Sequence, residues 1–174
     1  METPRKPKGL ISLSGNGQLF TWGQASSGQL GHGAMHELSS PCSISSLERQ
    51  PGIQIAMEGG QSAMVTEEGR LVHWGWNGTE KPISIPQILN VEAVKQVALG
   101  GFHGLCLVDH SASIRSSSLL TGWEVMSWGM NEHGQLGVMD EEKRMQPVVI
   151  PTLRTKGIVR VFAGMRTSFA LSGR

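Results

Sequence analysis

The chain has 174 residues, a net charge of +1 and only 17% charged residues, which argues against a strongly basic nucleic-acid-binding protein and an acidic solvating chain. It shows neither a run of about 18 apolar residues nor a signal-peptide pattern, so we expect no membrane contact and a cytoplasmic or nuclear location. Its 23 glycines favour short strands joined by tight turns.

In chain order, a basic segment over residues 1–8 comes first, and we expect it to be a flexible tail. The next segment, Gly17–Gly23, alternates between two faces, with Phe20 and Trp22 on one of them. Alternation of this kind predicts a β-strand. A Gly-Gln-Leu-Gly turn, Gly28–Gly31, begins six residues after the tryptophan.

The same segment recurs twice, with Trp74 lying 52 residues after Trp22 and Trp128 a further 54 residues on. We therefore divide the chain into units over residues 15–66, 67–108 and 122–172, with an inserted surface loop over 109–121. To the positions that carry the repeated signature we assign a structural role: Trp22, Gly23, Gly28, Gln29, Leu30, Gly31, Trp74, Gly75, Gly100, His103, Trp128, Gly129, Gly134, Gln135, Leu136, Gly137 and Gly164.

The expected fold is all-β, a partial β-propeller of about three four-stranded antiparallel blades, because a unit of about 50 residues with several short strands has the size of a blade. The strands are expected over residues 18–23, 61–66, 70–75, 103–108, 124–129 and 167–172. Only residues 45–49 and 140–145 hint at a helical turn.

At these residues the sequence resembles the regulator of chromosome condensation repeat. Two departures stand out: the second unit has Trp76–Glu80 where the others have Gly-Gln-Leu-Gly, and the family's histidine is kept only at His103, with Gln61 and Thr167 in the other units. The resemblance implies a seven-bladed propeller, which three units cannot close. We therefore expect open lateral faces that need further blades or self-association to cover them.

The resemblance also implies a function, that of a protein–protein interaction module. We expect it to act on or with a small GTPase, as a guanine-nucleotide exchange factor or its regulator, without covalent chemistry and without a cofactor. The alternatives are a non-catalytic scaffold within a larger propeller, and ultraviolet sensing through clustered tryptophans. Gly101 and Met165 stand where the light-sensing branch has tryptophan. No partner-binding residue can be assigned from the sequence.

The side chains that could carry chemistry favour structural roles. His103 has Asp109 nearby in sequence but no nucleophile motif, so we expect it to bond a backbone group at the start of a strand. Trp76 and Trp123 lie outside the repeated tryptophan position, and we expect them to be more exposed than the others. No glycine cluster forms a complete phosphate-binding motif.

A metal site is not expected either. His32, His36 and Cys42 lack a fourth ligand at zinc spacing, and His32 is expected to be an exposed loop residue. Cys42 and Cys106 form no paired motif, so both are expected to be reduced core thiols.

Overall fold

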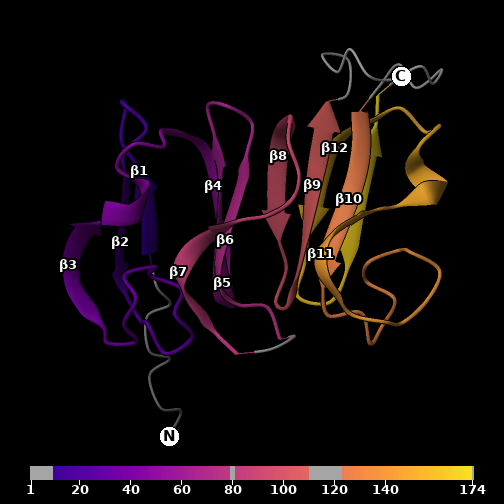
Figure 1. Ribbon diagram of the computed structural model, residues 1–174. Helices are drawn as coiled ribbons and strands as arrows, with labels where there is room; N and C mark the ends of the chain where they lie inside the picture. Colours follow the sequence, from indigo (N-terminus) through magenta and orange to yellow (C-terminus); the bar gives the residue numbers. More distant parts are fainter. Residues whose placement is uncertain (1–9, 79–80, 110–122, 174) are drawn as a thin grey trace, which may run out of the picture.

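The computed structural model describes residues 10–78, 81–109 and 123–173, and these residues fold mostly into β-strands (Figure 1). The strands are β1 (Leu10–Leu13), β2 (Leu19–Gly23), β3 (Leu38–Ser43), β4 (Gly52–Glu58), β5 (Gly60–Thr66), β6 (Leu71–Trp76), β7 (Ile83–Ile88), β8 (Val94–Leu99), β9 (His103–Asp109), β10 (Trp123–Gly129), β11 (Arg144–Val149), β12 (Ile158–Ala163) and β13 (Ser168–Ser172). In the described residues, two 3-10 turns, η1 (Ser45–Leu47) and η3 (Pro151–Leu153), lie in the connections between strands.

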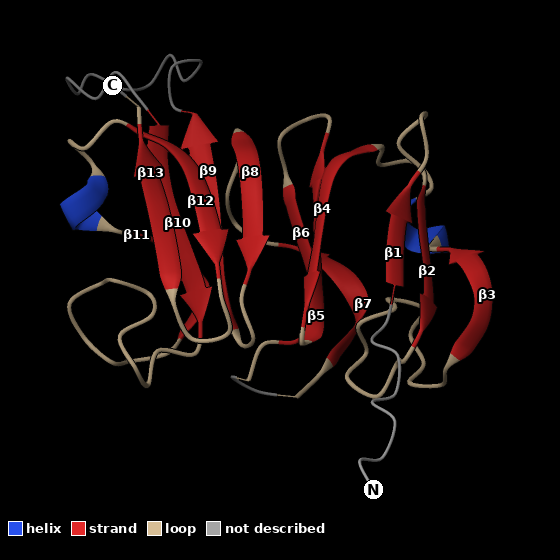
Figure 2. Cartoon of the chain, turned by 180° about the vertical axis from the view of Figure 1, so that it is seen from behind, coloured by secondary structure: helices blue, strands red, loops and turns tan. Residues whose placement is uncertain are grey.

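The strands form four antiparallel sheets, each built from strands that are consecutive in the chain. The first sheet has the order β1-β2-β3, the second β4-β5-β6-β7, the third β8-β9-β10-β11 and the fourth β12-β13. The sheets stand next to one another, as the views from both sides show (Figures 1 and 2). This arrangement confirms the predicted fold class, an all-β partial propeller.

A sequence unit does not coincide with a sheet. The unit that contains Trp22 contributes β2 and β3 to the first sheet and β4 and β5 to the second, and the other two units divide in the same way. The sequence predicted about three sheets of four strands. The described part of the chain instead has two four-stranded sheets, with a three-stranded sheet on one side and a two-stranded sheet on the other. Each unit spans a seam between sheets, so the backbone itself joins neighbouring sheets.

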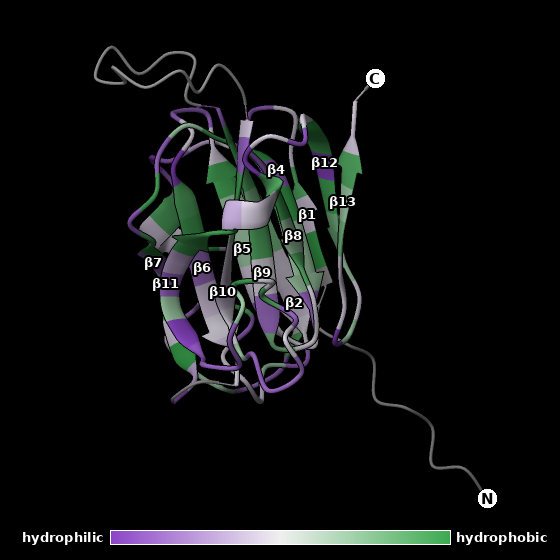
Figure 3. Ribbon diagram, turned by 90° about the vertical axis from the view of Figure 1, so that its right-hand side faces the viewer, coloured by the Kyte–Doolittle hydropathy of each residue, from purple (hydrophilic) through white to green (hydrophobic). Residues whose placement is uncertain are grey.

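Three apolar clusters fill these seams. The cluster between the first and second sheets contains Trp74, and the cluster between the second and third contains Trp128. The third cluster brings Leu107 of β9 against Val161 of β12. Figure 3 shows the hydrophobic residues along the strands and hydrophilic ones mainly in the connecting loops, the pattern of sheets that pack face to face.

One of the two expected helical turns is present in the structure and the other is not. A 3-10 turn lies within residues 45–49, whereas residues 140–145 form no helix. The tail over residues 1–8 and nearly all of the insert over residues 109–121 fall outside the described residues. Among the described residues, no helix is long and apolar enough to cross a membrane.

Candidate protein-interaction surfaces

The Gly-Gln-Leu-Gly turn of the first sheet holds the second sheet in place. The backbone carbonyl of Gln29 accepts two hydrogen bonds from the second sheet, from Ser62 Oγ at 2.8 Å and from the indole Nε1 of Trp74 at 2.8 Å. Within the first sheet, Thr21 Oγ1 donates to the Leu30 carbonyl at 2.7 Å and so fixes the turn on its own strand. The signature residues of this turn therefore lie in a packed seam.

The third sheet repeats this arrangement toward the fourth. Ser127 Oγ donates to the Leu136 carbonyl at 2.8 Å, as Thr21 does to Leu30. Ser168 Oγ donates to the Gln135 carbonyl at 2.6 Å and thus takes the place of Ser62. The turn glycines have positive φ in both copies, at Gly28, Gly31, Gly134 and Gly137.

The seam between the second and third sheets is built differently, because the second unit lacks the turn. Trp128 is completely buried there, but its Nε1 has no hydrogen-bond partner among the described residues. Gly104 stands where the other seams have Ser62 and Ser168, and a Cβ at this position would collide with the Trp128 ring. The indole thus occupies the space that a serine side chain takes in the other seams.

A buried glutamine–histidine pair replaces the missing contacts. His73 holds the place of Thr21 and donates from Nε2 to Gln61 Oε1 at 3.0 Å. Gln61 Nε2 in turn donates to the carbonyls of Gly100 at 2.9 Å and His103 at 3.0 Å in the third sheet. Burial lowers the pKa of His73 to about 4, so the ring is neutral and able to fill this site near pH 7.

The glycine that follows each signature tryptophan has a steric role. Gly23, Gly75 and Gly129 have φ of 96°, 89° and 101°, a conformation that other residues rarely adopt. A Cβ at Gly75 would also collide with the Gly60 carbonyl, and one at Gly129 with the Phe102 carbonyl. At Gly75 and Gly129, the absence of a side chain therefore allows two backbones to come into close contact at or near the end of the strand.

A glutamine on the first strand of the second sheet, and another on the first strand of the third, each hydrogen-bond the next sheet both as donor and as acceptor. Gln54 Oε1 accepts from the backbone N–H of Val97 at 2.8 Å, and its Nε2 donates to the Val97 carbonyl at 3.4 Å. Gln96 does the same with Val161, at 2.9 Å and 2.8 Å. Arg160 holds the equivalent position on β12, and a guanidinium can donate but cannot accept.

His103 and Asp109 do not form a catalytic pair, because they occupy opposite ends of β9. His103 Nε2 lies 3.0 Å from Ser168 Oγ, so it bridges to a side chain of the fourth sheet as well as lying at a strand start as expected. Burial lowers its pKa, an effect that the Thr167 backbone partly offsets. Before β13, the Gly164 N–H donates to the Thr167 carbonyl, as the Gly100 N–H donates to the His103 carbonyl before β9.

Two expectations about histidine and cysteine were wrong. His32 is half-buried and lies 2.9 Å from Thr21 Oγ1, because the turn folds back onto β2; burial and then His36 lower its pKa. Cys42 is exposed rather than in the core, since β3 lies at the outer edge of its sheet, whereas Cys106 is buried. Within the described residues, no group of three His, Cys, Asp or Glu side chains could hold a metal ion.

An apolar patch lies at the end of the sheets where the Trp-Gly pairs are, the lower end in Figure 1. This loop-end patch consists of Trp76, Phe102, Met130 and Met165, from three different sheets. The rings of Trp76 and Phe102 meet edge to face with centroids 5.5 Å apart. Met130 N donates to the Phe102 carbonyl at 2.9 Å, and Gly101 N to the Met165 carbonyl at 3.0 Å. The first of these bonds joins two loops of the third sheet, and the second joins the third sheet to the fourth.

The patch is accessible to a partner. Trp76 is 37% exposed and Met165 67% exposed, while Phe102 and Met130 are half-buried. Trp123, at the other end of the sheets, is 40% exposed, so both non-repeated tryptophans are more exposed than Trp74 and Trp128, as expected. Aromatic and methionine side chains that are exposed on a rigid support are typical of protein interfaces.

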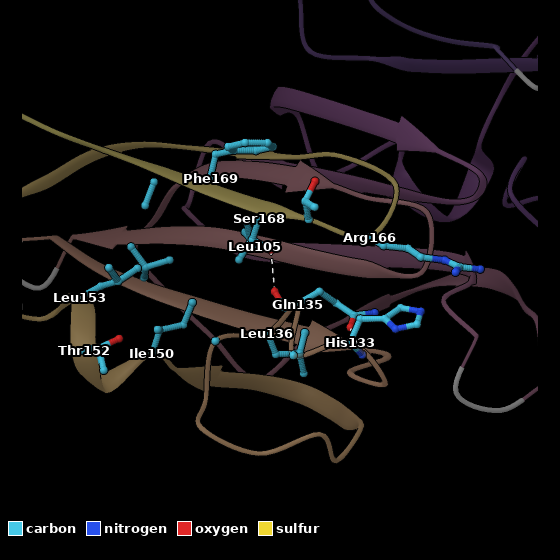
Figure 4. Close-up of a pocket in the computed structure, with 15 residues that line it drawn as sticks. Leu105, His133, Gln135, Leu136, Ile150, Thr152, Leu153, Arg166, Ser168 and Phe169 are labelled. Atoms are coloured by element: carbon cyan, nitrogen blue, oxygen red, sulfur yellow. Dashed lines mark hydrogen bonds between the residues drawn. The ribbon is translucent and has the colours of Figure 1, made fainter.

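A groove of about 500 Å³ lies between the third sheet and β13 (Figure 4). The turn Gly134–Gly137 forms one wall, and Ser168 and Phe169 of β13 form another. In the first seam, the space beside the equivalent turn is filled by the Trp74 ring. The groove is therefore the corresponding space without its tryptophan.

The comparisons with known proteins agree with this architecture. The regulator of chromosome condensation (RCC1) repeat matches residues 16–65 and 124–171. The chain belongs to the RCC1 repeat family. It is 30% identical over 167 residues to the mouse E3 ubiquitin-protein ligase HERC2, covering 95% of this chain and 3% of HERC2. It is 27% identical over 173 residues to the Arabidopsis thaliana ultraviolet-B receptor UVR8, covering 93% of this chain and 37% of UVR8.

Among solved structures, the chain is similar to Prp20p of Saccharomyces cerevisiae, with a TM-score of 0.78 and 19% identity over 95% of this chain and 42% of Prp20p. That structure was described with the binding of Prp20p to Gsp1p and histones. The chain thus spans less than half the length of each of these three RCC1-type relatives. The chain is an RCC1-type protein-interaction module.

The sequence did not predict the loop-end patch. The exposed position of Trp76 was a usable signal, because this tryptophan falls outside the repeat. Phe102, Met130 and Met165 carry no such signal, since they come from three separate loops that only the folded sheets bring together. Gly101 and Met165 are joined by a backbone bond at the positions where the light-sensing branch has tryptophan, so an indole cluster is missing there.

Proposed function

We propose that this chain is a non-catalytic interaction module that binds a protein partner through the loop-end patch. The observation that carries this proposal is the edge-to-face contact of the exposed Trp76 with the half-buried Phe102, at the junction of two rigid sheets. Large aromatic side chains with little rotamer freedom lose little entropy on binding, and they are enriched among the residues that dominate interface energies.

The chemistry of the patch favours a protein over a small molecule. The described patch residues are apolar and spread over three sheets, and they include no group that could act as a nucleophile or general base. Neighbouring backbone bonds hold the supporting loops, so the patch is formed before a partner arrives. Binding energy at such a surface comes from apolar burial and shape, without covalent chemistry or a cofactor.

The partner class that we propose is a small GTPase. Prp20p, which shares this fold, binds Gsp1p, and the family resemblance links such propellers to nucleotide exchange. Exchange needs loops arranged across a large part of a propeller face, and the four described sheets provide only part of a ring. We therefore expect this chain to bind a GTPase without releasing its nucleotide rapidly, and to act as a scaffold or regulator.

A titration with Gsp1p carrying a fluorescent guanine nucleotide tests both statements. Fluorescence anisotropy should show binding by the wild-type chain, a loss of at least about tenfold in affinity for Trp76→Ala, and no change for Ile85→Ala. Ile85 is a suitable control because it is 56% exposed on β7, away from the patch.

The same samples report nucleotide release. We expect a release rate close to the spontaneous one when the chain is substoichiometric. Equal affinities of the wild type and Trp76→Ala would contradict the patch, and fast catalytic release would contradict a scaffold or regulatory role.

A further inference from the structure

The groove beside β13 has a hydrogen-bond acceptor with spare capacity. In the first seam, one carbonyl, that of Gln29, accepts from both Ser62 and Trp74. In the groove, the equivalent carbonyl of Gln135 accepts from Ser168, and the position of the indole donor is not filled by any described residue. The groove therefore offers an apolar space and an acceptor at the place where the first seam holds a tryptophan.

The chain also carries a signature tryptophan, Trp22, that has no described sheet to pack against. On β6 and β10, the signature tryptophan points toward the preceding sheet, where Trp74 and Trp128 are completely buried. Trp22 has the same place on β2, but the described residues include no sheet before the first one, and Trp22 is only half-buried. One side of the molecule thus presents the tryptophan that the other side could receive.

The flanking strands complement each other in the same way. In the complete second sheet, Val65 has strand partners on both sides. Leu171 of β13 holds this place in the fourth sheet, where the described residues give it the inner partner Arg160 alone. Leu13 of β1 holds it in the first sheet, where the described residues give it the outer partner Leu19 alone. β13 and β1 are therefore the same strand of a blade, each in a sheet with fewer than four described strands.

The sequences of the two strands support an exchange. Residues 13–15 and 171–173 are both Leu-Ser-Gly, and Ile11 and Phe169 hold the equivalent apolar position two residues earlier. β13 could thus pair with β2 in the same register as β1. Phe169 and Leu171 are 58% and 53% exposed, and such an exchange would bury both in the places that Ile11 and Leu13 of the displaced β1 hold against the first-seam cluster.

We propose that two copies of this chain associate head to tail by completing one sheet. β12 and β13 of one copy join β2 and β3 of a second copy, with β13 in the place that β1 holds in the single chain. Trp22 of the second copy enters the groove and donates to the Gln135 carbonyl. The net charge of +1 offers little repulsion against this association.

The weak point of this assembly is Arg160. In the completed sheet Arg160 faces β4 of the second copy. At the equivalent position in the internal seams, Gln54 and Gln96 each accept from a backbone N–H and donate to the carbonyl of the same residue. A guanidinium cannot accept from the N–H. The joint between copies is therefore weaker than the internal seams, and Arg160→Gln should tighten it several-fold.

Sedimentation velocity over a range of concentrations tests the proposal. Because the joint is head to tail, the wild-type chain should grow beyond 18.8 kDa in steps of one chain as concentration rises, toward rings or short filaments. Trp22→Ala should weaken this growth at least tenfold, whereas the matched control Trp123→Ala should not change it. Phe169→Asp, which places a charge in the groove at an exposed position, should also stop it.

A mixing experiment identifies the two surfaces independently. Trp22→Ala keeps the groove and Phe169→Asp keeps the tryptophan, so an equimolar mixture should form a heterodimer of twice 18.8 kDa that grows no further. Far-UV circular dichroism of each variant shows that it is folded. A wild-type chain that stays at 18.8 kDa at every concentration, or a folded mixture that remains monomeric, overturns the proposal and assigns the groove to a strand of another protein.

Discussion

Replacing Trp74 and Trp128 one at a time by phenylalanine separates the two kinds of seam. Both indoles are completely buried, and each change removes the same ring atoms from a packed seam. The difference lies at Nε1, which donates to the Gln29 carbonyl at 2.8 Å in Trp74 and has no partner among the described residues in Trp128. The cavity cost is therefore similar in the two variants, and the hydrogen bond decides between them.

The expected difference is large enough to measure. A buried hydrogen bond contributes roughly 1 kcal/mol net, and a buried donor without a partner costs roughly 1–3 kcal/mol. Trp74→Phe loses the bond, whereas Trp128→Phe removes the unpaired donor. Trp74→Phe should therefore lower the free energy of unfolding by about 2 kcal/mol more than Trp128→Phe. For a chain of this size, that corresponds to a Tm about 4–8 °C lower.

Urea unfolding followed by far-UV circular dichroism is the suitable assay, because it does not depend on the tryptophan fluorescence that both changes alter. The slopes of the two unfolding curves should agree, so that the midpoints report stability. Equal losses, or a larger loss for Trp128→Phe, would show that the Trp128 indole has a partner and that the second seam is built like the first.

Three further predictions follow from the same contacts. Gly104→Ala should destabilise the chain by about 3 kcal/mol or more in urea unfolding, because its Cβ would collide with the Trp128 ring. Burial lowers the pKa of His73 from 6.5 to about 4, so as the pH falls the unfolded chain takes up this proton before the folded chain does. The free energy of unfolding should therefore be highest above pH 6.5 and fall by up to about 3 kcal/mol toward pH 4. His73→Gln should remove this pH dependence. Iodoacetamide should label the exposed Cys42 in the folded chain, while Cys106, whose pKa burial raises to about 12, should react only after unfolding, as mass spectrometry of the labelled peptides would show.

The sequence predicted the strands well because their signals are local. Alternation around each tryptophan and the turn glycines placed β2, β6 and β10 almost at their observed bounds. The division of units between sheets was not predictable in this way, since no local signal says whether a unit pairs within itself or across a seam. That choice depends on pairs between units, such as Ser62 with Trp74 and Gly104 with Trp128, which only the folded chain shows.

The second seam illustrates the same limit. The loss of Gly-Gln-Leu-Gly in the second unit was visible in the sequence, but its consequences were not. His73, Gln61 and Gly104 each differ from their counterparts in the other units by an ordinary substitution. Their meaning appears only when the structure brings them together around Trp128, where the changes replace the contacts of the missing turn.

One NMR experiment tests the central claim, that the loop-end patch binds a protein partner. The indole N–H signals of the five tryptophans report on separate places: Trp76 on the patch, Trp74 and Trp128 in the seams, Trp22 on the side of the first sheet and Trp123 at the other end. On addition of Gsp1p, the Trp76 signal should shift or broaden first, while those of Trp74, Trp128 and Trp123 stay in place. A complex that shifts Trp123 and leaves Trp76 unchanged would contradict the account.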